Sequence, residues 1–280
     1  MRQYIFALIG VLCVICESCD KAEVKSFHEQ PLLSHIDLDI YPLDYPNNQL
    51  APTIVFIHGG TWIGGDKSHW GHKQIQTFKN NQFLSISINY PTKYKHPAHI
   101  LSISKTLQWI QDSVSHYGGD PHKIILIGHS AGAHLAALAV TNQKYISENT
   151  NFALSNIKLV CMIDAGSYLT LSNGYPDAFY ANAFYQAAGS SLKDWQDFTP
   201  GNHISPTKNI PPFFLIYSND PYRDNANQLF CQKLTTNGIT TICRKISNTS
   251  SHYEMLYNFP TYTIEDSIAI MQTILTFITK

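Results

Sequence analysis

Charged residues are scarce in this chain of 280 residues, and neither sign is in excess. Asp, Glu, Lys and Arg make up 14% of the residues, with 19 basic against 20 acidic side chains, for a formal net charge of −1. A nucleic-acid-binding domain carries a basic surplus that attracts phosphates. We therefore expect no nucleic-acid partner and no recruitment to anionic lipid by charge.

Cofactor and metal motifs are also missing. No G-x-G-x-x-G sequence occurs, and Gly64-Gly65-Asp66-Lys67-Ser68 lacks the first glycine of a phosphate loop and would set a carboxylate against the phosphates. His69 and His72 have a loose ligand spacing, but no carboxylate or cysteine is organised around them. We expect no cofactor and no metal ion.

A membrane-spanning length of apolar sequence is absent, and the longest apolar run stands near the N-terminus. Arg2 precedes the run from Tyr4 to Ile15, which is shorter than the roughly 20 residues that cross a bilayer. A positive start and a run of this length are typical of a secretory signal, so we expect a signal peptide over residues 1–19 and export. Ser18 before Cys19 is typical of a bacterial lipoprotein signal, although Cys16 and Glu17 match it poorly. The mature chain is then periplasmic, secreted or lipid-anchored at Cys19.

Cysteines are few outside this leader. Three of the six lie within it, and Cys161 stands in an apolar run that predicts a small buried hydrophobe. Cys231 falls on a predicted helix and Cys243 on the strand that follows. A disulfide between them suits an exported protein, but the sequence does not show whether their Cβ atoms are close.

The remainder, residues 20–280, predicts a single α/β domain. Apolar or alternating segments predict strands at 35–41, 53–57, 83–88, 124–127, 159–163, 213–217 and 239–246, and helical stripes fall at 97–118 and 264–278. Strands that alternate with helices favour a mostly parallel sheet covered on both faces. Functional side chains are then expected at the C-terminal ends of the strands.

One motif points to nucleophilic chemistry. The apolar run Ile124–Ile127 leads into Gly128-His129-Ser130-Ala131-Gly132, which opens a helix-forming stretch. This G-x-S-x-G pattern between strand and helix is typical of a nucleophile elbow, where a sharp turn raises the serine at the end of the sheet. Larger side chains at the flanking glycines would collide with neighbouring backbone.

A second glycine-rich loop follows another predicted strand. Residues 53–57 lead into His58-Gly59-Gly60-Thr61-Trp62. Such a loop can direct backbone N–H groups at the oxygen that becomes negative during ester or amide hydrolysis. The expected donors are the amide of Ala131 and one or two amides from Gly59, Gly60 and Thr61. We interpret His58 as a residue that holds this loop by hydrogen bonding.

These motifs, with Tyr117-Gly118-Gly119-Asp120-Pro121 and a late Ser251-His252, resemble the α/β-hydrolase superfamily over residues 35–280. The resemblance is to the esterase branch that includes hormone-sensitive-lipase-like esterases, feruloyl and acetyl esterases, and arylformamidases. It implies an α/β-hydrolase fold with a mostly parallel central sheet. One departure is Asn89-Tyr90-Pro91, where such esterases often have Asn-Tyr-Arg.

The resemblance also implies a catalytic triad in the chain order Ser, acid, His. Ser130 is the expected nucleophile, and His252, on the loop after strand 239–246, is the expected base. The acid is expected after strand 213–217, at Asp220, with Asp224 as the alternative. Asp224 is more simply interpreted as the N-cap of the next helix. His252 would take the Ser130 proton and return it to the leaving group, while Asp220 would orient the imidazole.

Aromatic residues accumulate between residues 166 and 200, where this superfamily often carries a cap. We expect a small cap insertion there, with Trp62, His129 and Tyr168 as candidate pocket residues. The alternative, that the aromatic residues pack the cap's own core, stays open. His134, four residues after Ser130, is expected to pack or to line the pocket.

The function predicted from these residues is a serine esterase that cleaves small or medium carboxylic esters through an acyl-enzyme. An arylformamidase-like amide hydrolase is the nearest alternative, because the H-G-G-x-W and G-H-S-A-G motifs resemble that group as well. A non-catalytic binding protein on a hydrolase fold is a further alternative. Such proteins typically lose the serine, the histidine or the oxyanion glycines, and this chain keeps them all.

Overall fold

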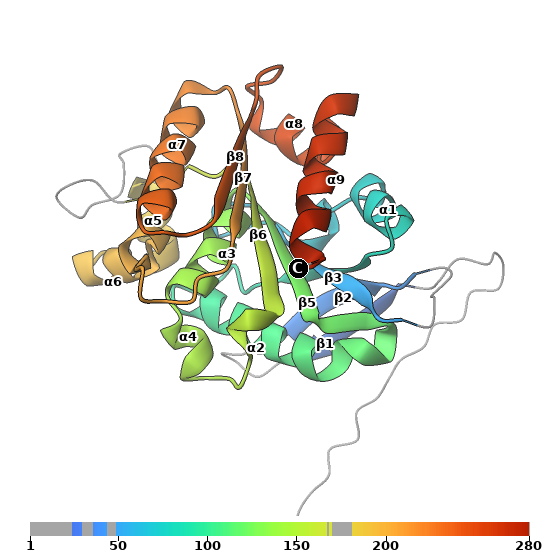
Figure 1. Cartoon of the computed structure of the whole chain (residues 1–280). Coiled ribbons are helices and arrows are strands. Elements are labelled where there is room, and N and C mark those ends of the chain that lie inside the picture. The colour runs from blue at the N-terminus through green and yellow to red at the C-terminus, as the bar shows by residue number, and fades with distance from the viewer. Residues whose placement is uncertain (1–23, 30–35, 44–48, 167, 170–180, 280) are drawn as a thin grey trace, which may run out of the picture.

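A single eight-stranded sheet organises the chain (Figure 1). The computed structural model describes residues 24–29, 36–43, 49–166, 168–169 and 181–279. The predicted signal peptide, residues 1–19, lies outside the described residues. The strand order is β1-β2-β4-β3-β5-β6-β7-β8. Strand β2 runs antiparallel to both of its neighbours, and the other strands are parallel to one another.

The observed strands confirm those predicted from the apolar and alternating segments. They are β1 (Lys25–Glu29), β2 (Ile36–Tyr41), β3 (Ala51–Ile57), β4 (Leu84–Asn89), β5 (Gly119–His129), β6 (Ile157–Ile163), β7 (Phe213–Ser218) and β8 (Thr241–Ile246). Only β1 was not predicted. In the central strand β5, Ile124 to Ile127 are fully buried, as expected for a strand covered on both faces.

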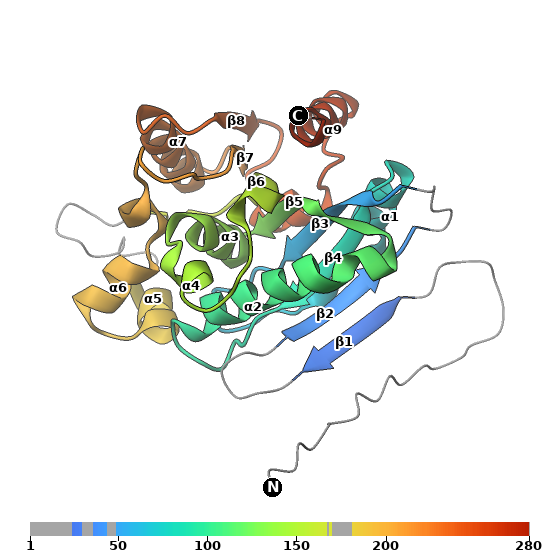
Figure 2. The ribbon, with the colours of Figure 1, turned by 60° about the horizontal axis from the view of Figure 1, so that its bottom comes forward.

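Helices cover the two faces of the sheet (Figures 1 and 2). They are α1 (His72–Asn80), α2 (Ala98–Ser113), α3 (Ala131–Thr141), α4 (Lys144–Ser147), α5 (Ala181–Ala188), α6 (Leu192–Phe198), α7 (Pro221–Thr236), α8 (His252–Tyr257) and α9 (Ile264–Ile278). One apolar core lies between the sheet and α2, α3 and α7, and a second lies between the sheet and α1 and α9. The mostly parallel sheet between two helical layers confirms the predicted fold class.

The insertion between β6 and β7 carries α5 and α6. Phe184 of α5 and Phe198 of α6 are fully buried, and their rings lie 5.4 Å apart. Both rings also pack at 5.3 Å from the indole of Trp62. The described part of the predicted cap is therefore joined to the domain through an aromatic cluster. Residues 167 and 170–180 of this segment lie outside the described residues.

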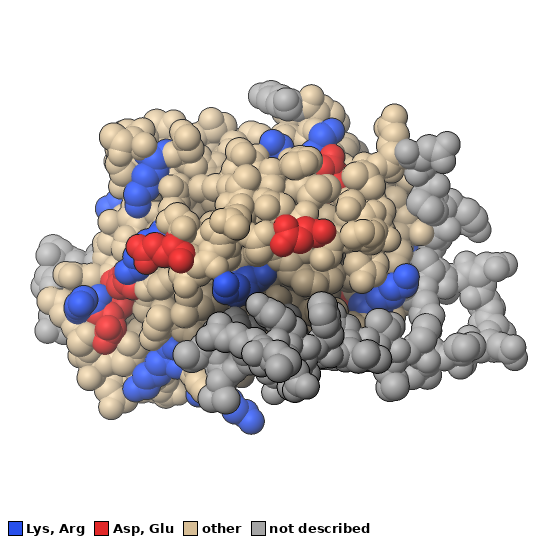
Figure 3. Space-filling view, turned by 90° about the horizontal axis from the view of Figure 1, so that it is seen from below, with Lys and Arg blue, Asp and Glu red and all other residues tan. Residues whose placement is uncertain are grey.

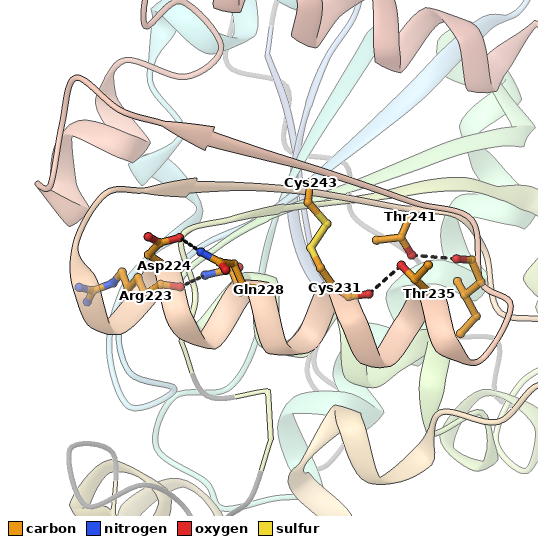
Figure 4. Close-up of a disulfide and its surroundings, with 9 residues drawn as sticks. Arg223, Asp224, Gln228, Cys231, Thr235, Thr241 and Cys243 are labelled. Carbon is orange, nitrogen blue, oxygen red and sulfur yellow. Dashed lines mark hydrogen bonds between the residues drawn. A yellow bond between two sulfur atoms is a disulfide. The ribbon is translucent and has the colours of Figure 1, made fainter.

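The two late cysteines form a disulfide (Figure 4). Cys231 lies in the middle of α7 and is bonded to Cys243 on β8, with Cα atoms 6.6 Å apart. Among the described strands, β8 pairs with β7 alone and is the last strand of the sheet. The bond therefore attaches an edge strand covalently to the helix that covers it. Cys161 is buried and free, as predicted.

Two local predictions were wrong at the ends of helices. Helix α7 begins at Pro221 rather than at Asp224, and Asp220 is its N-cap, whose side chain accepts a hydrogen bond from Arg223 N. Proline at the first helical position is a common start signal, which accounts for the earlier boundary. His252 begins the short helix α8 instead of lying on a loop, and Ser251 is its N-cap.

One face of the molecule carries few charged side chains. On the face shown in Figure 3, the few Lys and Arg side chains are interspersed with Asp and Glu among uncharged residues. None of the helices in the described ranges has the length and apolar content needed to cross a membrane.

Candidate active site

Ser130 occupies the sharp turn between β5 and α3. Its backbone has φ 54° and ψ −122°, a strained conformation for a residue with a side chain. Ser130 N donates to Ile163 O at 2.9 Å, which fixes the turn against the end of β6. A Cβ on Gly132 would lie 2.2 Å from Ile57 O, so only glycine lets α3 start this close to β3. The structure thus has the elbow geometry that the sequence predicted.

His252 is paired with a buried carboxylate. Its Nδ1 lies 2.8 Å from Asp164 Oδ2. Asp164 directly follows β6, and its side chain is fully buried. The other carboxylate oxygen, Oδ1, accepts a hydrogen bond from Ser218 N at 2.8 Å. Because Nδ1 faces the carboxylate, Nε2 of His252 is the nitrogen left to exchange a proton with a nucleophile.

Three chain segments bring Ser130, Asp164 and His252 to one end of the sheet. Strands β5 and β6 are parallel neighbours, so Ser130 and Asp164 follow adjacent strand ends. The His252 ring packs 4.4 Å from the ring of His129, the residue before Ser130. These contacts place the His252 ring beside the residue that precedes Ser130, and the convergence of the Ser130 hydroxyl with this imidazole stays a prediction.

Asp220, the predicted acid, does not contact His252, and that assignment is corrected here. Its Oδ1 accepts from Arg223 N at 3.0 Å and caps α7. The alternative, Asp224, pairs with Lys245 Nζ at 2.5 Å on the outer part of the helix. The topology explains why Asp164 rather than Asp220 meets His252. Helix α7 starts immediately after β7, so Asp220 serves as its N-cap. Strand β6, which Asp164 follows, lies next to the nucleophile strand β5. The sequence did contain a signal for Asp164, because this aspartate directly follows the apolar run 159–163.

The glycine-rich loop lies against the nucleophile. A Cβ on Gly59 would be 3.0 Å from the Ser130 Cβ, so the backbone approaches closely there. Gly60, Thr61 and Trp62 all have positive φ, and the amides of residues 63 and 64 donate to Gly60 O at 3.2 and 3.0 Å. Within the described residues, the amides of Gly59, Gly60, Thr61 and Ala131 make no hydrogen bond.

His58 supports this loop, as the sequence predicted. Its Nδ1 donates to Gly59 O at 2.7 Å, and its ring stacks on Tyr90 at 4.2 Å. Tyr90 OH donates to His58 O at 3.2 Å. Burial lowers the pKa of His58 to about 4, against an opposing effect of the Gly59 hydrogen bond, so the ring is neutral near pH 7.

A buried polar network holds the far end of the loop. Lys67 Nζ pairs with Asp37 at 2.5 Å and Asp39 at 2.8 Å, both on β2. Asn89 accepts from Lys67 N at 2.6 Å and donates to Asp37 at 2.8 Å and Asp66 at 3.0 Å. The first residue of the Asn89-Tyr90-Pro91 motif thus ties the loop to β2 and β4.

The predicted pocket residues are buried. Trp62 and Tyr168 are each 1% exposed and His129 is 3% exposed. Trp62 donates from Nε1 to His134 Nδ1 at 3.3 Å, and Tyr168 stacks on Phe230 of α7 at 4.5 Å. His134 is fully buried, and burial lowers its pKa well below the usual value. These contacts favour the packing alternative for Trp62, Tyr168 and His134.

His129 has a role that the sequence did not reveal. Its Nε2 donates to the backbone oxygen of His252 at 3.0 Å and so helps to fix the start of α8. Burial, and next the proximity of His252, lowers the pKa of His129 to about 3. The ring of His129 is therefore neutral at physiological pH.

Among the described residues, no cluster of three His, Cys, Asp or Glu side chains could hold a metal ion. His69 and His72 therefore gain no further ligand within the described ranges.

The sequence profile of a family described as BD-FAE matches residues 38–222. The chain belongs to the BD-FAE family. The matched span includes Ser130, Asp164 and the 58–62 loop, and it ends before His252. The resemblance to α/β-hydrolase esterases drawn from the motifs is thereby confirmed.

The curated relatives of this BD-FAE chain include named ester hydrolases. It is 25% identical over 202 residues to the probable carboxylic ester hydrolase LipM of Mycobacterium tuberculosis, covering 69% of this chain and 46% of LipM. It is 27% identical over 222 residues to the probable isoprenylcysteine alpha-carbonyl methylesterase ICMEL1 of Arabidopsis thaliana, covering 70% of this chain and 44% of that protein. The chain thus spans about half the length of the curated relatives it matches.

Solved structures share the fold. Esterase B of Lactobacillus rhamnosis superposes with a TM-score of 0.73 at 17% identity, covering 94% of this chain and 89% of that one. The carboxylesterase EstE1, from a metagenomic library, gives a TM-score of 0.71 at 19% identity, covering 92% and 89%. At these identities the likeness establishes the α/β-hydrolase fold.

Proposed function

We propose that this BD-FAE chain is a serine carboxylesterase that cleaves small or medium carboxylic esters through an acyl-enzyme. The observation that carries the proposal is the pair His252 Nδ1 to Asp164 Oδ2, 2.8 Å apart, at the strand end adjacent to the strained Ser130. Ser130 is the nucleophile, His252 the general base and acid, and Asp164 the residue that orients the imidazole.

Acylation begins when Ser130 Oγ attacks the ester carbonyl carbon and His252 Nε2 takes the hydroxyl proton. The carbonyl oxygen becomes negative and accepts hydrogen bonds from the free amides of Gly59, Gly60 and Ala131. Each donor of this kind lowers the barrier by about 3 kcal/mol. Asp164 stabilises the imidazolium through Nδ1, and the neutral ring of His129 beside it avoids repulsion.

The tetrahedral intermediate then loses its alcohol. The bond from the carbonyl carbon to the alcohol oxygen breaks, and His252 returns the proton to that oxygen. Water next attacks the Ser130 ester with His252 again as base, and the Ser130 oxygen leaves with the proton. The products are one carboxylic acid, one alcohol and the regenerated serine, so no cofactor is consumed.

The substitution test separates the two candidate acids. Ser130→Ala should remove hydrolysis of p-nitrophenyl butyrate, and Asp164→Asn should lower kcat about 10,000-fold because the wrong imidazole tautomer is favoured. Asp220→Asn should retain most activity, since asparagine is an equally good N-cap. Full activity in Asp164→Asn together with loss in Asp220→Asn would contradict the proposed triad.

The substrate class is tested with a panel of short acyl esters, feruloyl and acetylated sugars, and N-formylkynurenine. Ester hydrolysis that exceeds formamide hydrolysis supports the esterase, and the reverse order supports the arylformamidase-like alternative. Background rates on every member, by folded protein, would favour the non-catalytic alternative.

We further propose that the chain is exported and meets its ester substrate outside the cytoplasm. The Cys231–Cys243 disulfide supports this, because such bonds persist in oxidising compartments. Mass spectrometry of the mature N-terminus tests it: a chain that begins at Cys19 with attached lipid indicates anchoring, cleavage without lipid indicates a free periplasmic or secreted form, and an intact Met1 contradicts export.

A further inference from the structure

The carboxylate of Asp197 joins the insertion to the body of the domain. Asp197 lies near the end of α6, and Figure 2 shows α6 beside α4. Its Oδ1 accepts hydrogen bonds from Lys144 Nζ at 2.5 Å and from Asn142 Nδ2 at 3.1 Å. Its Oδ2 accepts from Tyr145 OH and lies 2.8 Å from His96 Nε2. One side chain of α6 is thus bonded to α4, to the end of α3 and to the loop before α2.

This carboxylate is charged near pH 7. Its side chain is 22% exposed. Burial raises the pKa of Asp197, but the hydrogen bonds from the four donors lower it more, so the pKa lies well below its usual range. With the carboxylate ionised, His96 Nε2 carries the proton that the two share. Hydrogen bonds to a charged, half-buried group are strong, so these four oppose any movement of α6 away from the body.

The loop before α2 holds both helices of the insertion. His96 N donates to Ala187 O, in the last turn of α5, at 2.6 Å, while the His96 ring contacts Asp197 of α6. The His96 side chain is 3% exposed. The attachment of the described part of the insertion is therefore concentrated at one buried point.

The residue after Asp197 contacts the glycine-rich loop. Phe198 is fully buried, and its ring lies 5.3 Å from that of Trp62 and 4.6 Å from that of His134. Trp62 directly follows Thr61, and the two have φ values of 65° and 51°. Left-handed conformations of residues with side chains persist only where the surroundings hold them. Phe198 is part of the packing that holds this pair.

We propose that Asp197 is a positioning residue, which acts through Phe198 and Trp62 to hold the 58–62 loop with its amides directed at the oxyanion. The inference rests on the proposed function. Without the carboxylate, α6 loses its four donors and Phe198 is no longer held against Trp62. Thr61 and Trp62 then relax toward ordinary φ values, and the amides of the loop move away from the reacting oxygen. The loss affects the transition state, in which this oxygen is negative, more than the binding of the neutral ester.

Steady-state kinetics of Asp197→Ala with p-nitrophenyl butyrate test the proposal. The kcat should fall about 100-fold and KM should change by less than about threefold, as expected for donors displaced by roughly 1 Å. An alkyl trifluoromethyl ketone forms an adduct with Ser130 that carries a negative oxygen at the same place. Its Ki should rise by the factor by which kcat/KM falls. A merely structural role would reduce the amount of active enzyme and leave the Ki unchanged.

Two further variants separate positioning from the stability of α6. Asp194→Ala is the matched control, because Asp194 lies on the same helix and accepts from Ser191 Oγ, at the N-cap of α6, at 2.5 Å. Its kcat should stay within about twofold of wild type and its Ki should be unchanged. Tyr145→Phe removes one of the four donors and keeps the ring, so kcat should fall about fivefold with a parallel rise in Ki.

Hydrogen exchange, measured by mass spectrometry, reports on the loop independently of catalysis. In wild type the amides of Ile63 and Gly64 donate to Gly60 O. Residues 58–64 and 181–188 should both exchange faster in Asp197→Ala, and Asp194→Ala should match wild type in residues 58–64.

An unchanged Ki, or unchanged exchange in residues 58–64, in folded Asp197→Ala would overturn the inference. If that variant does not fold, Tyr145→Phe decides by the same two measurements, and wild-type values in it reject the role of Asp197. Wild-type protein that hydrolyses no ester and does not bind the ketone would instead refute the proposed function. Faster exchange in residues 58–64 would still support the attachment of the loop through α6, so the two failures can be told apart.

Discussion

Breaking the disulfide between α7 and β8 should destabilise the domain with little effect on the chemistry at Ser130. The perturbation is the double variant Cys231→Ser/Cys243→Ser, which leaves both elements in place. The two cysteines are 12 residues apart in the sequence. The chain-entropy relation for a loop of this length gives about 3 kcal/mol of stabilisation, through restriction of the unfolded chain.

The assay is reversible urea unfolding of the mature protein, monitored by fluorescence, with and without dithiothreitol. The double variant should lose about 3 kcal/mol of unfolding free energy, or roughly 6 to 12 °C in Tm. Reduced wild type should match it, and dithiothreitol should leave the variant unchanged. Equal midpoints for oxidised wild type and the double variant would refute the reasoning.

Two further predictions concern pH and backbone packing. Burial lowers the pKa of His58 and His99 to about 4 and that of His129 to about 3, so the unfolded chain binds more protons than the folded one between these values and about 6.5. The contribution of these neutral histidines to the free energy of unfolding is full above pH 6.5 and is lost as the pH falls. The loss is about 1 kcal/mol per histidine at pH 5.5. Equal free energies of unfolding in urea at pH 7 and pH 5.5 would argue against this. Gly132→Ala should cost about 2 kcal/mol or more and lower kcat about 100-fold, because its Cβ would collide with Ile57 O. Gly64→Ala, whose Cβ would have ordinary contacts, is the stability control, and a loss equal to that of Gly132→Ala would contradict the steric explanation.

Local patterns predicted most of the fold and part of the site. Period-two and apolar segments located the strands, and the glycines around Ser130 marked the elbow, because these signals depend only on neighbouring residues. The carboxylate was misplaced since its identity depends on which strand end lies nearest to His252 in space. Asp164 and Asp220 both follow apolar strands, and the sequence alone does not measure that distance.

The disulfide and the role of His129 illustrate the same limit. Cys231 and Cys243 were suitable in type and spacing, but only the packing of α7 on β8 brings their Cβ atoms together. His129 was considered as a pocket residue because it adjoins Ser130. Its hydrogen bond to the His252 backbone arises from a contact between residues 123 positions apart, for which no local signal exists.

The hydrogen bond from Asn227 to Ala165 has a mechanical consequence. The cap insertion starts at about residue 166. Asp164, which bears the carboxylate, and Ala165 directly precede it in the chain. Asn227 lies within α7, and its hydrogen bond to Ala165 O holds the backbone at the last residue before the insertion. The backbone that follows Asp164 is thereby fixed to α7 rather than to the insertion that comes after it.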